Sequence, residues 1–305
     1  MSRQLYPTLE NNLYKAVGIV FLLLAKIKHK ARGYTTPRPF PVDQYQRAFE
    51  YDINVVNNWL SHLQRYTGDK ATVENKTVLE VGPGADLGAG LYLLHKGAKS
   101  YSAIDVHDLA ESVPTTFYES FVEHLARVAP PVTPEYLLSQ VGLSKTNGAG
   151  QLNYVCRPDF DICAAFDKSS VDLVFSQAAF EHFDDVEQTI KQLSLVSKPG
   201  AILVIEIDLI THSRWIRDKD PNNIYRYSAE FYKLFDFPGI PNRIRPYEYR
   251  KFLEENGWTN ISITQQATIS DERVRETQPY LDERFQHSSC DMGFLDIMIC
   301  ATRQP

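Results

Sequence analysis

The sequence predicts an α/β protein whose core is a doubly wound, mostly parallel β-sheet covered by helices on both faces. Three observations support this fold class. From residue 77 onward, short apolar segments alternate with segments of helical periodicity, and turn residues separate them. The chain has 305 residues, 43% of them apolar, which is enough to bury a large core. Its 23% of charged residues, with Gly and Pro spread along the chain, excludes disordered and fibrous proteins.

Residues 1–41 form the first predicted unit, a basic and apolar helical arm. Residues 1–40 contain seven basic residues and one acidic residue, whereas the whole chain has a net charge of −6. Residues 16–25 are ten consecutive apolar positions, but a helix that spans a bilayer needs about 20. Basic residues follow where the cleavage site of a signal peptide would stand, so we expect no signal peptide.

Two roles for this arm stay open from the sequence. In one, the arm is a helix that packs against the domain that follows it. In the other, residues 13–32 make a peripheral contact with an anionic membrane, because a short apolar stretch with a basic end suits that surface.

Charge and cysteine content predict location and partners. The pI of about 5.8 argues against a nucleic-acid partner. The four cysteines show neither a metal-binding spacing nor the density of a disulfide framework, so we expect a cytoplasmic protein, with any membrane contact on the inner face. The sequence does not determine the number of subunits.

The second predicted unit, residues 42–305, begins after a proline-rich joint at residues 36–41. A helix is expected over residues 43–66, where apolar residues recur at helical spacing. The strands expected from apolar runs are 77–81, 100–106, 152–156, 171–176, 201–208, 258–263 and 294–301. Helices are expected at 88–96, within 107–150 and at 186–196. Three insertions, 107–150, 209–245 and 265–292, exceed ordinary connection lengths and are expected to carry specificity.

A glycine turn after the first strand predicts a ligand site. Gly82 and Gly84 allow a ligand to lie against the turn and to face the following helix. Asp105 ends the next strand, where an acid reaches ribose hydroxyls in doubly wound sheets, so an adenosine-containing ligand is expected. A dinucleotide is disfavoured, because the third glycine, Gly88, comes one position late and Glu80 would repel a phosphate.

Three segments of the sequence match a known family: Glu80, Gly82 and Gly84 of a first motif, residues 171–183 with their Glu-His pair, and residues 195–201 at the turn into the fifth strand. On these segments the sequence resembles the class I S-adenosylmethionine-dependent methyltransferases, specifically those with a type 11-like methyltransferase domain. The last segment departs from the family only at Ala201, where the family has a second glycine. The resemblance implies a seven-stranded Rossmann-like sheet with an antiparallel last strand, and S-adenosylmethionine as the cofactor.

The resemblance also implies cofactor contacts. Gly82 and Gly84 would lie against the methionine part, which Glu80 would orient, Asp105 would bind the ribose, and Ser176 would border the sulfonium. The adenine contact would come from Asp159, which we prefer for its distance from the fourth strand, or from Asp161.

Two histidines are the candidate catalytic residues. His182 follows the fourth strand and His212 the fifth, and either could act as the base for a hydroxyl acceptor or could orient that acceptor. Glu181, His182, Asp184 and Asp185 cluster in the sequence, but we expect no metal there. The side chains of adjacent residues should diverge at a helix start, and acidic residues are ordinary in the first turn of a helix. The aromatic residues of 209–245 could wall an acceptor pocket or form the core of a cap. Arg243 and Arg245 could bind an anionic acceptor group or form exposed ion pairs.

The predicted function is therefore methyl transfer from S-adenosylmethionine to a small-molecule, glycan or lipid-linked acceptor, at oxygen. Residues 207–212 and 242–258 are similar to a bacterial subgroup often associated with cell-surface glycan or secondary-metabolite pathways. Two alternatives are a non-catalytic binding or scaffold protein that keeps this fold, and a nicotinamide-dependent oxidoreductase.

Overall fold

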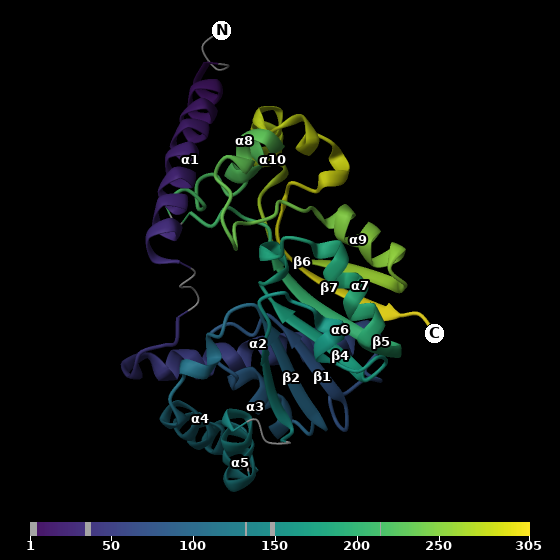
Figure 1. The fold of residues 1–305 in the computed structure, drawn as a ribbon. Coiled ribbons are helices and arrows are strands. Elements are labelled where there is room, and N and C mark those ends of the chain that lie inside the picture. Colours follow the sequence, from purple (N-terminus) through teal and green to yellow (C-terminus); the bar gives the residue numbers. More distant parts are fainter. Residues whose placement is uncertain (1–4, 34–37, 132, 147–149, 214) are drawn as a thin grey trace.

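The computed structural model describes residues 5–33, 38–131, 133–146, 150–213 and 215–305. Its centre is one seven-stranded sheet with strand order β3-β2-β1-β4-β5-β7-β6 (Figure 1). The strands are β1 (Thr77–Val81), β2 (Ser100–Asp105), β3 (Leu152–Cys156), β4 (Val171–Gln177), β5 (Ser197–Asp208), β6 (Trp258–Thr268) and β7 (Phe294–Arg303). The predicted fold class, including the seven strands, is confirmed.

Strand directions follow the doubly wound pattern. β1 pairs in parallel with β2 and β4, β2 with β3, and β4 with β5. β7 lies antiparallel between β5 and β6, as expected for the last strand. Successive strands are added on one side of β1 as far as β3, and from β4 onward on its other side. Open α/β sheets bind their ligands at such a switch point, beyond the carboxyl ends of the strands.

Helices cover both faces of the sheet because alternate strand residues point to opposite faces. One face packs against α2 (Tyr45–Thr67), α3 (Gly88–His95), α4 (Thr115–Val128) and α5 (Pro134–Lys145). The other packs against α6 (Ile162–Ala165), α7 (Val186–Val196) and α9 (Pro246–Glu255). In β4, Phe175 faces the first group, where it stacks on Trp59 with ring centroids 5.0 Å apart, while Val174 faces the second.

The helix α2 illustrates how local sequence sets an element. Its buried positions, among them Phe49, Val56, Trp59 and Leu63, recur every three or four residues and make one apolar face. The helix ends at Gly68, which adopts the left-handed conformation with φ 64° that a glycine takes without strain.

A cap beside the sheet has its own apolar core. It combines segments of two insertions, which include α8 (Ala229–Lys233) and α10 (Asp271–Thr277), with the N-terminal helix α1 (Leu5–Arg32) (Figure 1). Tyr225, Tyr227, Tyr232 and Phe235 pack there with Leu22 of α1. These four aromatic residues of 209–245 therefore form a core, and of the two roles left open for them the structure supports this one. Trp215 is exposed.

Several boundaries differ from the sequence expectations. α1 extends well beyond the ten-residue apolar stretch, and α4 and α5 occupy much of 107–150. β6 continues to Thr268, so the third insertion begins later than residue 265. Thr36 and Pro37 of the predicted proline-rich joint lie outside the described residues. Arg38–Pro41 are not helical, and η2 (Val42–Gln44) begins next.

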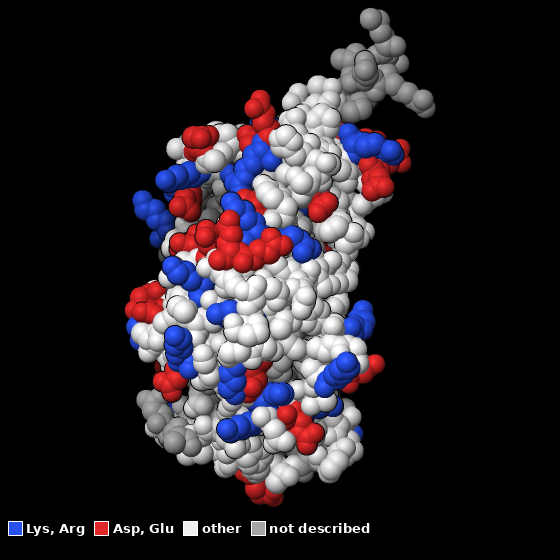
Figure 2. Space-filling view, turned by 90° about the vertical axis from the view of Figure 1, so that its right-hand side faces the viewer, with Lys and Arg blue, Asp and Glu red and all other residues white. Residues whose placement is uncertain are grey.

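The surface charge is mixed, and the helices are too polar or too short to span a membrane in the part of the chain that the structure describes. Figure 2 shows Lys and Arg interspersed with Asp and Glu on the face that it presents. None of the helices in the described part of the chain combines the length and the apolar character needed to cross a bilayer.

Candidate active site

The glycine turn after β1 has the backbone geometry that the sequence predicts. Gly82 and Gly84 have φ values of 72° and 77°, in the region that favours glycine. A Cβ at Gly82 would lie 2.6 Å from the Cβ of Ala179, which follows β4. The turn can therefore pass close to the end of β4 only because residue 82 has no side chain.

Glu80 is buried beneath this turn. Its Oε2 accepts a 2.6 Å hydrogen bond from the hydroxyl of Tyr101. Burial raises the pKa of Glu80 to about 8, although the bond from Tyr101 works in the opposite direction. A positive charge nearby would favour the ionised carboxylate, so the site suits a cationic ligand.

Two further carboxyl groups lie beside Glu80, and neither was predicted from the sequence. Asp86 follows the glycine turn and accepts a 2.8 Å hydrogen bond from the backbone N–H of Gly88. Asp52 comes from α2, and a Cβ at Gly88 would lie 2.0 Å from its Oδ2. Burial raises the pKa of both carboxyl groups, and the closeness of Asp86 raises that of Asp52 further. One signal was available, because Asp52 occupies the apolar face of a predicted helix.

Asp105 lies at the end of β2, as expected for a ribose contact. Its Oδ1 accepts a 3.1 Å hydrogen bond from the backbone N–H of His107. Burial raises the pKa of Asp105, while backbone N–H groups, including that of Gly84, lower it. The structure thus brings Asp105 to the glycine turn that follows the neighbouring strand.

The remaining cofactor candidates already have partners within the protein. Asp159 is exposed and forms a 2.8 Å ion pair with Arg157. Asp161 caps α6 by accepting a hydrogen bond from the N–H of Ala164. Ser176 is fully buried and donates to the carbonyl of Val81 at 2.7 Å, which ties β4 to β1. Their roles toward adenine and sulfonium stay predictions.

His182 and His212, the two candidate catalytic residues, meet directly. Their rings are nearly perpendicular, and their Nε2 atoms lie 3.1 Å apart. Nδ1 of His182 lies 2.6 Å from the carbonyl of Gly239, and Nδ1 of His212 lies 3.1 Å from that of Ile210. A carbonyl only accepts, so each Nδ1 carries a hydrogen. The two facing Nε2 atoms therefore need one proton or one cation between them.

The environment of His182 keeps this ring neutral. Burial and, to a smaller extent, the neighbouring His212 together lower the pKa of His182 to about 4, while the carbonyl of Gly239 works in the opposite direction. His182 lies in η4 (Phe180–His182), directly after β4, and His212 is exposed just beyond β5. The pair thus consists of one half-buried ring and one solvent-facing ring.

Glu181 completes a cluster that could hold a metal ion. One oxygen of Glu181 and one nitrogen each of His182 and His212 lie within 4.8 Å of one another. Glu181 is buried, neither of its oxygens has a hydrogen-bond partner among the described residues, and burial raises its pKa well above the usual value. The expectation that Glu181 and His182 diverge is wrong, because η4 is a 3₁₀ turn that lets both approach His212.

Arg243 and Arg245 do not bind an acceptor, and neither forms an exposed ion pair. Arg243 is buried, donates to the carbonyls of Ile224 and Tyr227, and stacks 4.1 Å over Tyr232. Arg245 is fully buried, and it donates to the carbonyls of Cys290, Asp291 and Phe294 and to the hydroxyl of Tyr225. Both expectations were wrong because the cap has irregular backbone whose carbonyls need buried donors.

Comparison with known proteins identifies a methyltransferase domain in part of the chain. Residues 133–205 match the family model described as a methyltransferase domain, a segment that includes β4 and most of β5. No curated protein matches the sequence. The family match and the strand order confirm the resemblance found in the motifs. Residues 133–205 thus match a methyltransferase domain, within a sheet whose strand order is the one that the resemblance implies.

Many solved structures are similar to this chain at low identity. An S-adenosylmethionine-dependent methyltransferase from Mesorhizobium loti has 13% identity and a TM-score of 0.42, over 78% of this chain and 96% of that one. Phosphoethanolamine N-methyltransferase 2 of Haemonchus contortus, in complex with S-adenosyl-L-methionine, has 15% identity and a TM-score of 0.44, over 82% and 53%. The CurJ carbon methyltransferase has 15% identity and a TM-score of 0.39, over 78% and 51%. The chain spans about half the length of the last two proteins.

Proposed function

We propose that this protein transfers the methyl group of S-adenosylmethionine to an oxygen atom of a small-molecule, glycan or lipid-linked acceptor. The observation that supports it most directly is the His182–His212 pair, 3.1 Å apart at the ends of β4 and β5. The glycine turn after β1 belongs to the same carboxyl edge of the sheet. We place the reaction in the cytoplasm, where the four free cysteines stay reduced.

The residues around the glycine turn suit the cofactor. S-adenosylmethionine supplies a methyl group on a positively charged sulfur, so the carbon–sulfur bond breaks with its electron pair going to sulfur while the carbon–oxygen bond forms. The carboxyl groups of Glu80, Asp52 and Asp86 lie beside the turn, the first two buried and the third half-buried. A cationic ligand lowers the cost of ionising them. Asp105 offers acceptor oxygens to the ribose hydroxyls.

The histidine pair suits a hydroxyl acceptor. Such an acceptor must lose its proton during methyl transfer, and a neutral imidazole within hydrogen-bond reach can take it. The low pKa of His182 keeps its Nε2 unprotonated at neutral pH. The proton passes to the pair and leaves through His212, which faces solvent.

Two measurements test this proposal. Titration calorimetry should show binding of S-adenosylmethionine, and methyl-labelled cofactor should label a hydroxyl-bearing compound in a fractionated cell extract. Lack of binding at millimolar cofactor would favour the scaffold alternative, and a nicotinamide cofactor in the mass spectrum of the purified protein would favour the oxidoreductase. Label found only on carbon or nitrogen would overturn the assignment to oxygen.

A further inference from the structure

The helix α1 exposes a continuous apolar stripe. Its exposed large apolar side chains are Leu9, Leu13, Val20, Leu23, Leu24 and Ile27, each 48–70% exposed. Their spacing places them on one face of the helix, within about 100° of its circumference. From Leu9 to Ile27 the stripe is about 27 Å long, at a rise of about 1.5 Å per residue. Single exposed apolar residues are ordinary, but a contiguous patch of this kind marks an interaction surface.

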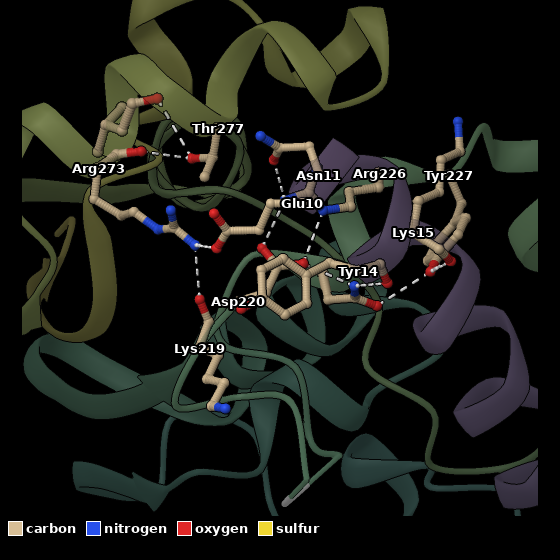
Figure 3. Close-up of polar contacts among 12 residues, drawn as sticks. Glu10, Asn11, Tyr14, Lys15, Lys219, Asp220, Arg226, Tyr227, Arg273 and Thr277 are labelled. Carbon is tan, nitrogen blue, oxygen red and sulfur yellow. Dashed lines mark hydrogen bonds and ion pairs between the residues drawn. The ribbon is translucent and has the colours of Figure 1, made fainter. Parts of the chain in front are cut away.

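The opposite face of α1 is fixed to the cap by polar contacts (Figure 3). Buried Asn11 accepts a 2.7 Å hydrogen bond from Arg226, which also forms a fully buried ion pair with Asp220. The backbone carbonyls of Tyr14 and Lys15 accept bonds from Asn223 and Tyr227.

Close packing fixes the rotation of the helix as well. A Cβ at Gly18 would lie 1.9 Å from Oδ1 of Asn223 and 2.2 Å from the hydroxyl of Tyr227. The helix approaches the cap this closely only because residue 18 has no side chain. Its rotation is therefore set by the cap, and the apolar stripe cannot turn inward.

The charges of α1 are concentrated at its C-terminal end. Lys28, Lys30 and Arg32 are exposed in the last two turns, next to the end of the apolar stripe. Glu10, the one acidic residue among the described positions of α1, lies near the other end and pairs with Arg273 at 3.6 Å. The surface thus combines an apolar stripe with an unopposed positive end, which complements a layer of acidic headgroups over an apolar interior.

The same end of α1 lies close to the candidate active site. Lys26 donates to the carbonyl of Leu234 at 2.8 Å, and the ring of His29 stacks on Phe237 at 5.0 Å. Two residues further along, the carbonyl of Gly239 contacts Nδ1 of His182. A short segment of the cap therefore connects the basic end of α1 to the histidine pair.

We propose that the exposed stripe of α1 docks on an anionic membrane surface, with the helix lying flat and its lysines and arginine at the headgroups. Docking places the histidine pair near the lipid surface and selects a lipid-linked hydroxyl compound as the acceptor. The docking does not depend on the proposed function, whereas this choice of acceptor does. A parallel pair of α1 helices from two copies is disfavoured, because their basic ends would repel each other. An antiparallel pair would appear as a dimer in solution.

Vesicle flotation of the full-length protein tests the docking. Wild-type protein should float with vesicles of phosphatidylcholine containing one-third phosphatidylglycerol, and not with phosphatidylcholine alone. The double variant Leu24→Gln/Ile27→Gln should lose membrane partitioning by at least about tenfold, since each buried methylene contributes about 0.8 kcal/mol. The variant Lys28→Glu/Lys30→Glu should lose the dependence on acidic lipid. A matched control, Val128→Gln/Leu195→Gln, changes two exposed apolar residues elsewhere and should float like wild type.

Three results would overturn the docking: wild-type protein that stays unfloated, flotation that is equal on both vesicle types, or a solution dimer that the Leu24→Gln/Ile27→Gln variant converts to a monomer. Circular dichroism and S-adenosylmethionine affinity, measured on every variant, show that each is folded. Because affinity for the cofactor is measured separately, failure of docking and failure of the proposed methyl transfer are distinguishable.

A second experiment tests the acceptor: the labelled methyl group should enter the lipid fraction. Label confined to water-soluble products would overturn the lipid-linked assignment alone.

Discussion

The two halves of the candidate active site are built in different ways. The cofactor half consists of strand ends and the turns that follow them, and Gly82, Asp105 and Glu80 are all placed by neighbouring parallel strands. The acceptor half depends on the cap. Asn242 donates to the carbonyls of Phe180 and Phe183, and the carbonyl of Gly239 contacts His182. A segment about 60 residues away in sequence therefore holds the turn that contains His182.

The two halves also meet the hydrogen-bonding needs of their backbones differently. In the sheet, the backbone N–H and C=O groups of neighbouring strands bond to one another. The interior can therefore be almost entirely apolar. The cap has little regular structure, so buried arginines supply donors to its carbonyls. Damage to the cap should therefore remove the acceptor half and leave the cofactor half intact, and the following predictions test this separation.

The largest effect is expected from Arg245→Met. This change leaves several buried carbonyls without a donor and should lower the free energy of unfolding by about 3–5 kcal/mol. Hydrogen exchange should show that protection is lost mainly in 209–245 and 269–293, while S-adenosylmethionine still binds. Arg217→Met, at an exposed arginine, serves as the control. Equal loss of protection in β1 and β4 would mean that cap and sheet unfold as one unit.

His182→Ala should lower the rate of methyl transfer by about 10²–10⁴-fold and leave cofactor affinity unchanged, because the histidine acts on the acceptor. In the wild type, the base form of His182 is lost only as the pH falls through about 4, so the rate should be level across mildly acidic pH. His212→Gln removes the neighbouring ring that lowers this pKa, and the acidic limb should move to higher pH. A limb that stays in place would contradict the coupling of the two rings.

Asp105→Ala should weaken binding of S-adenosylmethionine by about 1.5–3 kcal/mol, or about 10- to 150-fold, because hydrogen bonds from the ribose to a carboxylate are lost. Calorimetry measures this directly. The affinity of the Asp159→Ala variant, measured in the same way, separates the ribose contact from the proposed adenine contact. Unchanged affinity for Asp105→Ala would remove the ribose assignment.

A smaller effect is expected from pH. The pKa of Glu80 in the folded protein, about 8, lies above its ordinary value, so the folded state holds a proton that the unfolded chain releases. Stability should therefore fall as pH rises from about 4.5 through 8. Binding of a cation favours the carboxylate, so cofactor affinity should rise by about tenfold from pH 6 to 8, with proton release visible as a buffer-dependent binding enthalpy. Glu80→Gln should reduce that dependence, and the part that remains would come from Asp52 and Asp86, whose pKa values are also raised.

The smallest effect is expected from chelation. If the histidine pair accepts a proton, dialysis against a chelator should leave the rate of methyl transfer unchanged. Chelation tests for a bound metal because the side chains of Glu181, His182 and His212 could hold a divalent cation. Activity that is lost on chelation and restored by one added metal would replace the proton-accepting role with metal-assisted deprotonation.

The sequence predicted the cofactor half better than the acceptor half. The strand β1, the glycine turn and the acid at the end of β2 are local patterns, so their places followed from the order of strands. Asp52 was missed because it joins this site from a helix that precedes the sheet, although its place on an apolar helix face was a usable signal. Arg243 and Arg245 were assigned wrongly because their partners are backbone carbonyls from other parts of the cap.

The alternation of apolar strands and helices determined the fold class, and the glycine turn predicted the kind of cofactor, because those features depend on neighbours in sequence. Only the tertiary structure decided that His182 and His212 share one site, that Glu181 joins them, and which face of α1 is left exposed. Each of these depends on packing between segments far apart in the chain, where burial and the supply of hydrogen-bond partners set a side chain's role.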